Sequence, residues 1–228
     1  MSQASATYYK RDFWADENLK YQQPHFRLEK AARLANRIAG EQECDLLDVG
    51  CGPAALRRLL KPNINYYGID IAIHEPSPSL VEMDFVESPI AFNGKRFDII
   101  VAQGVFEYIG KVQQQKLSEI GALLNENGTF IATYINFDHR NKSIYWPYNN
   151  MQPFTVFYRS LSQFFHVDKF FPTSQRWRHD EPKGRLMKAA QMHMNLNIPF
   201  ITRMLAVEYF FVCSPRFRAC SSGSRVAD

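Results

Sequence analysis

A glycine-rich turn and two aspartates are the residues of this sequence whose spacing points most directly to chemistry. Asp48 lies two residues before Gly50, and Gly52 and Ala55 complete the pattern Gly-x-Gly-x-x-Ala. The glycines allow a tight turn in which the backbone approaches a ligand, and a helix that starts there offers unpaired N–H groups. Asp70 follows Gly50 by twenty residues, where a carboxylate can accept both hydroxyls of a ribose. Together they predict a nucleoside-cofactor site.

Short apolar runs alternate with helical patterns around this turn. The run Phe97–Ala102 is almost continuously apolar, which is typical of a strand covered on both faces. The alternation predicts an α/β fold, a parallel sheet with helices on both faces. We expect strands at 44–49, 65–70, 79–84, 97–102, 129–135, 166–171 and 206–213. We expect helices after Pro24 up to Gly40 and at 54–60, 112–124, 154–165 and 185–196, with a polar loop at 173–184.

The composition is that of an ordinary globular protein. The chain has 228 residues, of which 46% are hydrophobic and 22% charged, and this excludes collagen-like or wholly disordered chains. No apolar run reaches the roughly 18 residues of a membrane span, and residues 1–7 lack the features of a signal peptide. The four cysteines show no Cys-x-x-Cys spacing, so we expect reduced thiols, no metal site and a cytoplasmic location. They are Cys44, Cys51, Cys213 and Cys220.

Charge is divided unevenly between the two parts of the chain. Residues 1–138 carry 14 Lys and Arg against 18 Asp and Glu, whereas residues 139–228 carry 13 against 5. The basic second part predicts contact with an anionic substrate, and Arg176 and Arg178 are the candidates to bind its phosphate or carboxylate. The alternative is a solvated loop in which Asp180 and Glu181 balance these charges.

Five motifs then appear in a recognisable order. They are Leu47–Gly52, Gly68–Asp70, Met83–Phe85, Phe97–Tyr108 and Asn127–Phe130. With them the sequence resembles the class I S-adenosylmethionine-dependent methyltransferases, of the small-molecule type that acts on sugars and other natural products. The resemblance covers roughly residues 40–138 and the final strand. Ala54 departs from it, because the family often has a third glycine there; we expect altered loop detail rather than lost binding.

The resemblance implies a Rossmann-like, seven-stranded, mostly parallel sheet with the last strand antiparallel, and S-adenosyl-L-methionine as the cofactor. Asp70 would accept the ribose hydroxyls and Asp84 the adenine amino group, although a helix N-cap is the alternative for Asp84. The other implied contacts follow the parts of the cofactor. They are Asp48, Gly50, Cys51 and Gly52 for the methionine part, Ile71 and Phe85 for the adenine faces, and Gln103 and Val105 for the sulfonium.

Methyl transfer by in-line displacement requires mainly alignment, and a general base only where the nucleophile arrives protonated. His139 is the candidate base because it follows the fifth strand, and a surface-loop histidine is the alternative. Tyr134 is a fallback. Tyr9, Trp14 and Tyr108 are aromatic candidates for contact with the acceptor, the first two in an N-terminal lid. The alternative for that segment is an extra helix packed on the core.

We therefore expect one methyltransferase domain over 1–213. It would comprise a lid and helix (1–39), a cofactor-binding core (40–138) and substrate-side elements (139–205), followed by a disordered tail (214–228). An NAD-dependent oxidoreductase shares the turn and Asp70 but lacks a Tyr-x-x-x-Lys pair. A nucleic-acid methyltransferase fits poorly, because Glu107 stands alone where small-RNA enzymes carry several metal ligands. A non-catalytic adaptor with this fold is the third alternative.

The sequence thus predicts an enzyme of secondary metabolism that methylates oxygen or nitrogen of a small molecule, anionic or sugar-like. We expect no nucleic-acid or membrane partner, and the oligomeric state stays open.

Overall fold

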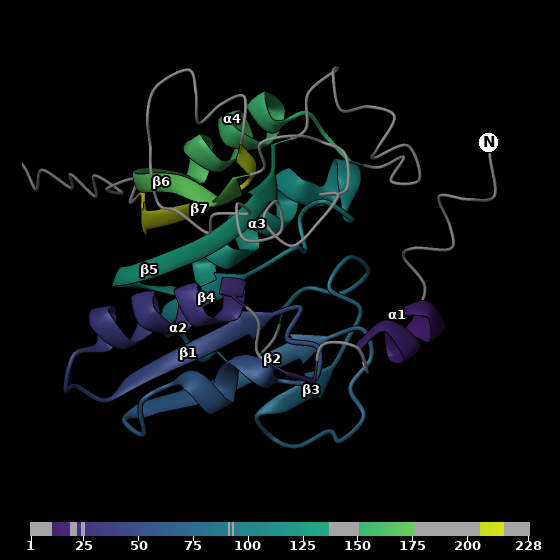
Figure 1. Cartoon of the computed structure of the whole chain (residues 1–228), viewed down its shortest axis with the longest axis vertical. Coiled ribbons are helices and arrows are strands. Elements are labelled where there is room, and N and C mark those ends of the chain that lie inside the picture. The colour runs from purple at the N-terminus through teal and green to yellow at the C-terminus, as the bar shows by residue number, and fades with distance from the viewer. Residues whose placement is uncertain are drawn as a thin grey trace, which may run out of the picture.

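A seven-stranded sheet forms the centre of the computed structural model, with strand order β3-β2-β1-β4-β5-β7-β6 (Figure 1). The structure describes residues 11–18, 22–23, 26–90, 92, 94–136, 151–175 and 206–216. The strands are β1 (Cys44–Val49), β2 (Ile64–Asp70), β3 (Leu80–Glu82), β4 (Phe97–Ala102), β5 (Leu124–Ile135), β6 (Phe165–Gln175) and β7 (Ala206–Pro215). The helices are α1 (Arg11–Asn18), α2 (Phe26–Ala39), α3 (Gln113–Leu123) and α4 (Phe154–Phe164), with short 3-10 turns η3 (Ala55–Leu59) and η4 (Gly110–Val112).

One strand runs against the other six. The pairs β1–β2, β1–β4, β2–β3 and β4–β5 are parallel, whereas β7 pairs antiparallel with both β5 and β6. The predicted sheet, with its last strand antiparallel, is therefore confirmed. Because β7 pairs with β5 and β6 pairs with β7, the described parts of the predicted core and substrate-side segments share one sheet.

Alternate residues of the central strands face two separate hydrophobic clusters. Leu47 and Ile100 pack in a cluster that includes residues of α3 and α4. Leu46 and Ile99 pack in a second cluster with residues of α2. Both faces of β1 and β4 are thus covered by helices, which explains why these strands read as continuous apolar runs.

The helix that covers the second cluster is built for close approach to the sheet. Four of its buried side chains are alanines, and their small size lets α2 lie near the strands. The helix ends where the sequence predicts, since Gly40 follows it with φ +58°, a left-handed conformation that glycine adopts without strain.

The later strands differ in length from the sequence prediction. β5 begins at Leu124 rather than at residue 129, and Asn125–Gly128 form an irregularity, because Phe97 pairs with Leu124 while Ile99 pairs with Thr129. β6 continues to Gln175, into the predicted polar loop, and β7 continues to Pro215, into the predicted tail. Pairing across the sheet extended these strands beyond their apolar runs. The predicted helix at 185–196 lies outside the described residues.

No helix in the described part of the chain combines the length and apolar character needed to cross a membrane.

Candidate functional site

A pocket of about 210 Å³ opens at the carboxyl ends of the parallel strands. Its lining includes Gly50 after β1, Asp70 at the end of β2, Gln103 after β4 and Ile135 at the end of β5. Strand β1 lies between β2, which follows it in sequence, and β4, so the chain changes direction across the sheet there. Ligands of open α/β sheets bind in the crevice outside such a switch point.

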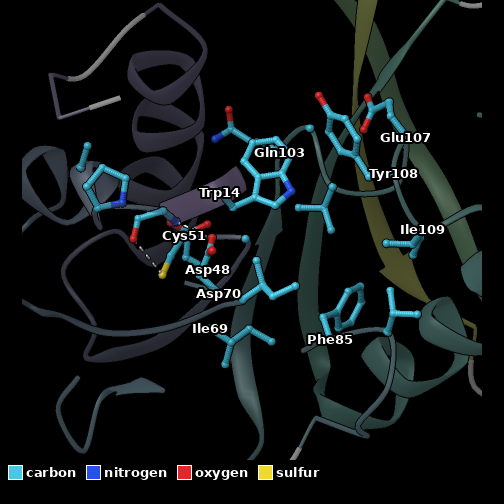
Figure 2. Close-up of a pocket in the computed structure, with 18 of the residues that line it drawn as sticks. Trp14, Asp48, Cys51, Ile69, Asp70, Phe85, Gln103, Glu107, Tyr108 and Ile109 are labelled. Atoms are coloured by element: carbon cyan, nitrogen blue, oxygen red, sulfur yellow. Dashed lines mark hydrogen bonds between the residues drawn. The ribbon is translucent and has the colours of Figure 1, made fainter. Parts of the chain in front are cut away.

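All ten residues that the sequence nominates for cofactor binding line this pocket. They are Asp48, Gly50, Cys51, Gly52, Asp70, Ile71, Asp84, Phe85, Gln103 and Val105. In Figure 2, Asp48, Cys51 and Asp70 lie on one side of the pocket and Glu107 and Tyr108 on the other. The ten cofactor candidates come from four separate segments of the chain, and the shared edge of the sheet brings them together.

The glycine-rich turn is held in place by strand β2. The N–H groups of Gly50 and Cys51 both donate to the carbonyl of Ile69, at 2.8 and 3.0 Å. Gly50 has φ +72°, and a Cβ atom there would lie 2.4 Å from Cγ2 of Val105. Only glycine fits this position, since any side chain would both strain the backbone and collide with the loop after β4.

Ala54 adopts φ 54° and ψ 33°, the left-handed region, and is the only non-glycine residue with positive φ in the described part of the chain. The family's third glycine therefore corresponds to a position where this turn requires a left-handed backbone. The alanine retains the turn at a cost of roughly 1–2 kcal/mol.

Asp70 and Asp84 hold backbone as well as face the pocket. Asp70 accepts the N–H of Gly52 at 2.8 Å and that of Ala72 at 3.1 Å, so it fixes the second glycine of the turn. Asp84 accepts the N–H groups of Val86 and Glu87, at 2.9 and 3.3 Å. Residues 85–87 form a turn and no helix begins there, so Asp84 caps a turn rather than the helix of the alternative interpretation, and its contact with a ligand stays a prediction. A carboxylate can accept about four hydrogen bonds, so each of these aspartates can also accept one from a ligand.

Asp48 is a buried carboxyl, 4% exposed, at the floor of the turn. Burial, with a smaller contribution from the nearby charge of Asp70, raises its pKa to about 7. The hydroxyl of Tyr66 donates to Oδ2 of Asp48 at 2.8 Å and opposes the rise. A bound cation would favour the charged form of this carboxyl, so its surroundings suit a positively charged ligand group.

Gln103 presents an amide to the pocket. Both its Oε1 and its Nε2 are buried without a hydrogen-bond partner among the described residues. Because unsatisfied buried polar atoms are costly, this amide is placed to bind a polar ligand group.

The structure describes two of the five residues predicted to bind the acceptor. Trp14 of α1 and Tyr108 both line the pocket, and their rings meet edge to face with centroids 5.1 Å apart. Arg11 anchors this helix to the end of β3 through two hydrogen bonds to Glu82, at 2.9 and 3.2 Å. Tyr9, His139, Arg176 and Arg178 lie outside the described residues.

Tyr134 does not occupy the position predicted for a fallback base. Its side chain is fully buried in the core and stacks on Phe157 with ring centroids 4.0 Å apart. Its hydroxyl donates to the carbonyl of Gln152 and accepts from Nε2 of Gln113. Burial raises the pKa of Tyr134 above its usual range, and the residue is not part of the pocket lining. As an inward-facing residue of β5 it packs on α4 instead.

Sequence reasoning missed two charged residues of the pocket, Arg27 and Glu107. Arg27 of α2 donates to Oε1 of Glu208 on β7 at 3.0 Å, a contact across 181 positions of sequence. No local pattern indicates this contact. The sequence analysis weighs Glu107 only as a metal ligand, although its place five residues after β4 puts it at the edge where the other pocket residues gather. Within the described ranges no group of three or more His, Cys, Asp or Glu residues could hold a metal ion.

Comparisons with known proteins agree with this geometry. The profile of the methyltransferase domain family matches residues 23–170. Among solved structures, a chain of the complex between the Haloferax volcanii Trm112 methyltransferase activator and a putative methyltransferase is similar over 90% of this chain and 96% of its own, with 17% identity and a TM-score of 0.63. None of the curated proteins matches the sequence significantly.

Two further solved structures are similar at low identity. One is the N-methyltransferase NodS of Bradyrhizobium japonicum WM9 in complex with S-adenosyl-L-homocysteine. The similarity extends over 90% of this chain and 99% of the NodS chain, with 11% identity and a TM-score of 0.55. A TehB-like S-adenosylmethionine-dependent methyltransferase of Corynebacterium glutamicum is covered over 88% and covers 83%, with 15% identity and a TM-score of 0.55.

The fold is therefore that of the S-adenosylmethionine-dependent methyltransferases. The chain belongs to the methyltransferase domain family. The cofactor that the motifs imply, S-adenosylmethionine, is confirmed for this class of fold.

The polar groups that line the pocket suit this cofactor. Three aspartates, Asp48, Asp70 and Asp84, provide acceptors for ammonium, ribose hydroxyl and adenine amino donors. The unpartnered amide of Gln103 and the close approach of Gly50 to Val105 shape the space between them.

Proposed function

We propose that this protein transfers a methyl group from S-adenosylmethionine to a small-molecule acceptor bound in the same pocket. The observation that carries the proposal is the convergence of all ten nominated cofactor residues on one pocket at the carboxyl ends of the strands. When bound, S-adenosylmethionine supplies an electrophilic methyl group carried on a positively charged sulfur.

Different residues of the pocket would bind different parts of the cofactor. Asp70 would hold the ribose hydroxyls and Asp84 the adenine amino group, while Asp48 would face the methionine part together with the backbone of Gly50, Cys51 and Gly52. Ile71 and Phe85 would contact the faces of the adenine. Gln103 and Val105 would border the sulfonium.

Trp14 and Tyr108 support an acceptor site beside this cofactor site. They are the two nominated acceptor residues that the structure describes, and both face the pocket. They would position the acceptor and exclude water, and alignment of this kind can contribute roughly 7–11 kcal/mol. We keep oxygen or nitrogen as the methylated atom, and a sugar-type or anionic metabolite as the proposed acceptor, with Arg176 and Arg178 as its predicted anion-binding residues. The buried free thiols Cys44, Cys51 and Cys213 agree with the proposed cytoplasmic location.

Calorimetry tests the cofactor assignment. We expect S-adenosylhomocysteine to bind and NAD not to bind. Asp70→Ala should lower the affinity for S-adenosylhomocysteine by 100-fold or more, because hydrogen bonds to a charged group contribute roughly 1.5–3 kcal/mol each. Asp168→Ala, which removes an exposed carboxylate of β6, is the matched control and should bind normally.

Tight binding of NAD without binding of S-adenosylhomocysteine would point to an oxidoreductase and contradict the proposal. A transfer screen with tritiated methyl groups over pools of small molecules, with the product identified by mass spectrometry, then names the acceptor. Binding of the cofactor without transfer to any pool would favour the non-catalytic adaptor.

A further inference from the structure

The carboxyl of Glu107 lies in the pocket but has no part in the proposed cofactor contacts. It is only 1% exposed, and its Oε1 accepts the backbone N–H of Ile135 at 3.0 Å. This bond ties the loop after β4 to the end of β5. The other oxygen, Oε2, is buried and has no hydrogen-bond partner among the residues that the structure describes. The fold therefore holds Oε1 of Glu107 in place, while Oε2 is left with unused hydrogen-bonding capacity.

The surroundings of Glu107 are those of an acceptor site. Figure 2 shows Glu107 and Tyr108 across the pocket from Asp48 and Asp70. Tyr108 makes the edge-to-face pair with Trp14, so aromatic surface flanks the carboxyl on the pocket side. An acceptor that packs its apolar body on these rings would bring a polar group to the carboxyl.

Three ionisable groups interact with Glu107 from the elements packed around it: Arg27 of α2, Glu208 of β7 and Tyr134 of β5. Tyr108, the next residue in the loop, is a fourth ionisable group beside it and interacts with Arg27. Burial and, to a smaller extent, the charge of Glu208 raise the pKa of Glu107 to about 8, although Arg27 opposes the rise. A carboxyl with its pKa close to the operating pH is a much stronger base than an exposed one.

We propose that Oε2 of Glu107 binds the nucleophilic O–H or N–H group of the acceptor and takes its proton during methyl transfer. The proposal rests on the proposed function and narrows its acceptor to a molecule that arrives with a proton on the reacting oxygen or nitrogen. The electron pair of the acceptor forms the bond to the methyl carbon, the pair of the broken carbon–sulfur bond stays on sulfur, and the proton ends on Oε2. Glu107 starts as the carboxylate, so charge is conserved.

Glu107→Gln is the sharpest variant for this proposal. The amide oxygen can still accept the N–H of Ile135, so the loop is preserved, but the side chain can no longer take a proton. Glu126→Gln makes the same chemical change at an exposed position and is the matched control. His139→Ala is the comparison variant, because the sequence nominates that histidine for the same role. Glu107→Asp retains a carboxyl and serves if the glutamine variant does not fold.

Kinetics give the first readout. With the acceptor found by the methyl-transfer screen and saturating S-adenosylmethionine, wild-type kcat/KM should rise with pH to a plateau. The midpoint should lie at or below about 8, since the positive charge of the cofactor favours the carboxylate. Glu107→Gln should lower kcat by about 10²–10⁴-fold and lose this acidic limb, while its affinity for S-adenosylhomocysteine stays unchanged. Glu107→Asp should keep the limb with a lower kcat.

Nuclear magnetic resonance gives a second readout that needs no turnover. In protein labelled with ¹³C at the glutamate carboxyls, one resonance should titrate near pH 8 in the wild-type protein, Glu126→Gln and His139→Ala. It should be missing in Glu107→Gln.

The proposal is overturned if Glu107→Gln keeps the wild-type kcat and pH profile. It is also overturned if the limb disappears in His139→Ala but not in Glu107→Gln, or if no glutamate titrates near pH 8. In these cases S-adenosylhomocysteine binding and methyl transfer by the wild-type protein still stand, so the proposed function survives. Failure of the wild-type protein to bind S-adenosylhomocysteine would remove both.

Discussion

Among the residues proposed to bind the cofactor, Asp48 is the carboxyl whose pKa burial raises most clearly. The sequence indicates its position before the glycine turn, but its pKa of about 7 arises from a fully enclosed environment in which only the Tyr66 hydroxyl donates to Oδ2 among the contacts described. In the absence of ligand this carboxyl holds a proton that an exposed aspartate would have lost.

Because the pKa of Asp48 is raised in the folded state, the folded chain holds a proton between about pH 4 and pH 7 that the unfolded chain has released. The free energy of unfolding should therefore fall as pH rises through this window, by about 4 kcal/mol for this group. Asp48→Asn removes that dependence. Glu107 acts in the same direction up to about pH 8, so some decline should remain in the variant.

Urea denaturation of the ligand-free protein at several pH values between 4 and 9 measures the effect. The difference between wild type and Asp48→Asn reports this carboxyl together with its coupling to Asp70, because titrating groups far from Asp48 contribute equally to both. Asp168→Asn, at an exposed site, should give no such difference. A wild-type curve that parallels the Asp48→Asn curve across this range would mean that Asp48 is charged in the folded protein.

The turn between β1 and η3 is the element on which the cofactor site depends. It is held by two hydrogen bonds to Ile69 and one to Asp70, and its first glycine touches the loop after β4. The turn thus joins the ends of three strands. A substitution in this turn should therefore disturb the pocket residues at the ends of β1, β2 and β4.

Gly50→Ala tests this element. The added Cβ would meet Val105 at 2.4 Å and would impose strain at φ +72°. We expect destabilisation of about 1–3 kcal/mol and loss of S-adenosylhomocysteine binding by at least tenfold, measured by denaturation and calorimetry. Gly40→Ala has similar backbone strain, with φ +58°, but no atom within 4 Å of the added Cβ. It should lose stability and keep its affinity. Equal affinities of the two variants would show that the contact with Val105 is dispensable.

At the scale of the whole molecule, Arg27 and Glu208 join the beginning of the described core to its last strand. The guanidinium and the carboxylate lie 3.0 Å apart, with Glu208 only 7% exposed at its side chain. Burial and Arg27 together set the environment of Glu107, so this ion pair connects the global fold to the proposed chemistry. A partner removed from a buried pair leaves an uncompensated charge.

A double-mutant cycle measures this connection. Arg27→Met should destabilise the protein by roughly 1–3 kcal/mol, because the half-buried guanidinium of Arg27 no longer faces the carboxylate of Glu208, and the added change Glu208→Gln should recover part of the loss. Glu41→Gln, which breaks an exposed pair with Lys61, should cost less than about 1 kcal/mol. Additive effects of Arg27→Met and Glu208→Gln in urea denaturation would contradict a coupled pair.

The sequence by itself determined the local elements around the site and the set of residues that would gather there. The predicted bounds of β1 and β4 agree with the structure residue by residue, since their apolar runs and flanking polar residues are local signals. The ten cofactor candidates converge because each lies at or just after the carboxyl end of a strand, and the ends of parallel strands share one edge. That argument needs no knowledge of side-chain packing.

Only the tertiary structure decided which charged groups of the site are buried and which predicted site residues lie outside the pocket. Tyr134 turned into the core because the pleat of β5 points it at Phe157, and no composition rule fixes that choice. Arg27 and Glu107 entered the pocket through contacts with residues far along the chain. Strand lengths at β5 and β6 were likewise set by pairing with neighbours. Burial and charge depend on what distant segments place around a group, so the proton chemistry proposed for Glu107 becomes visible only when the chain is folded.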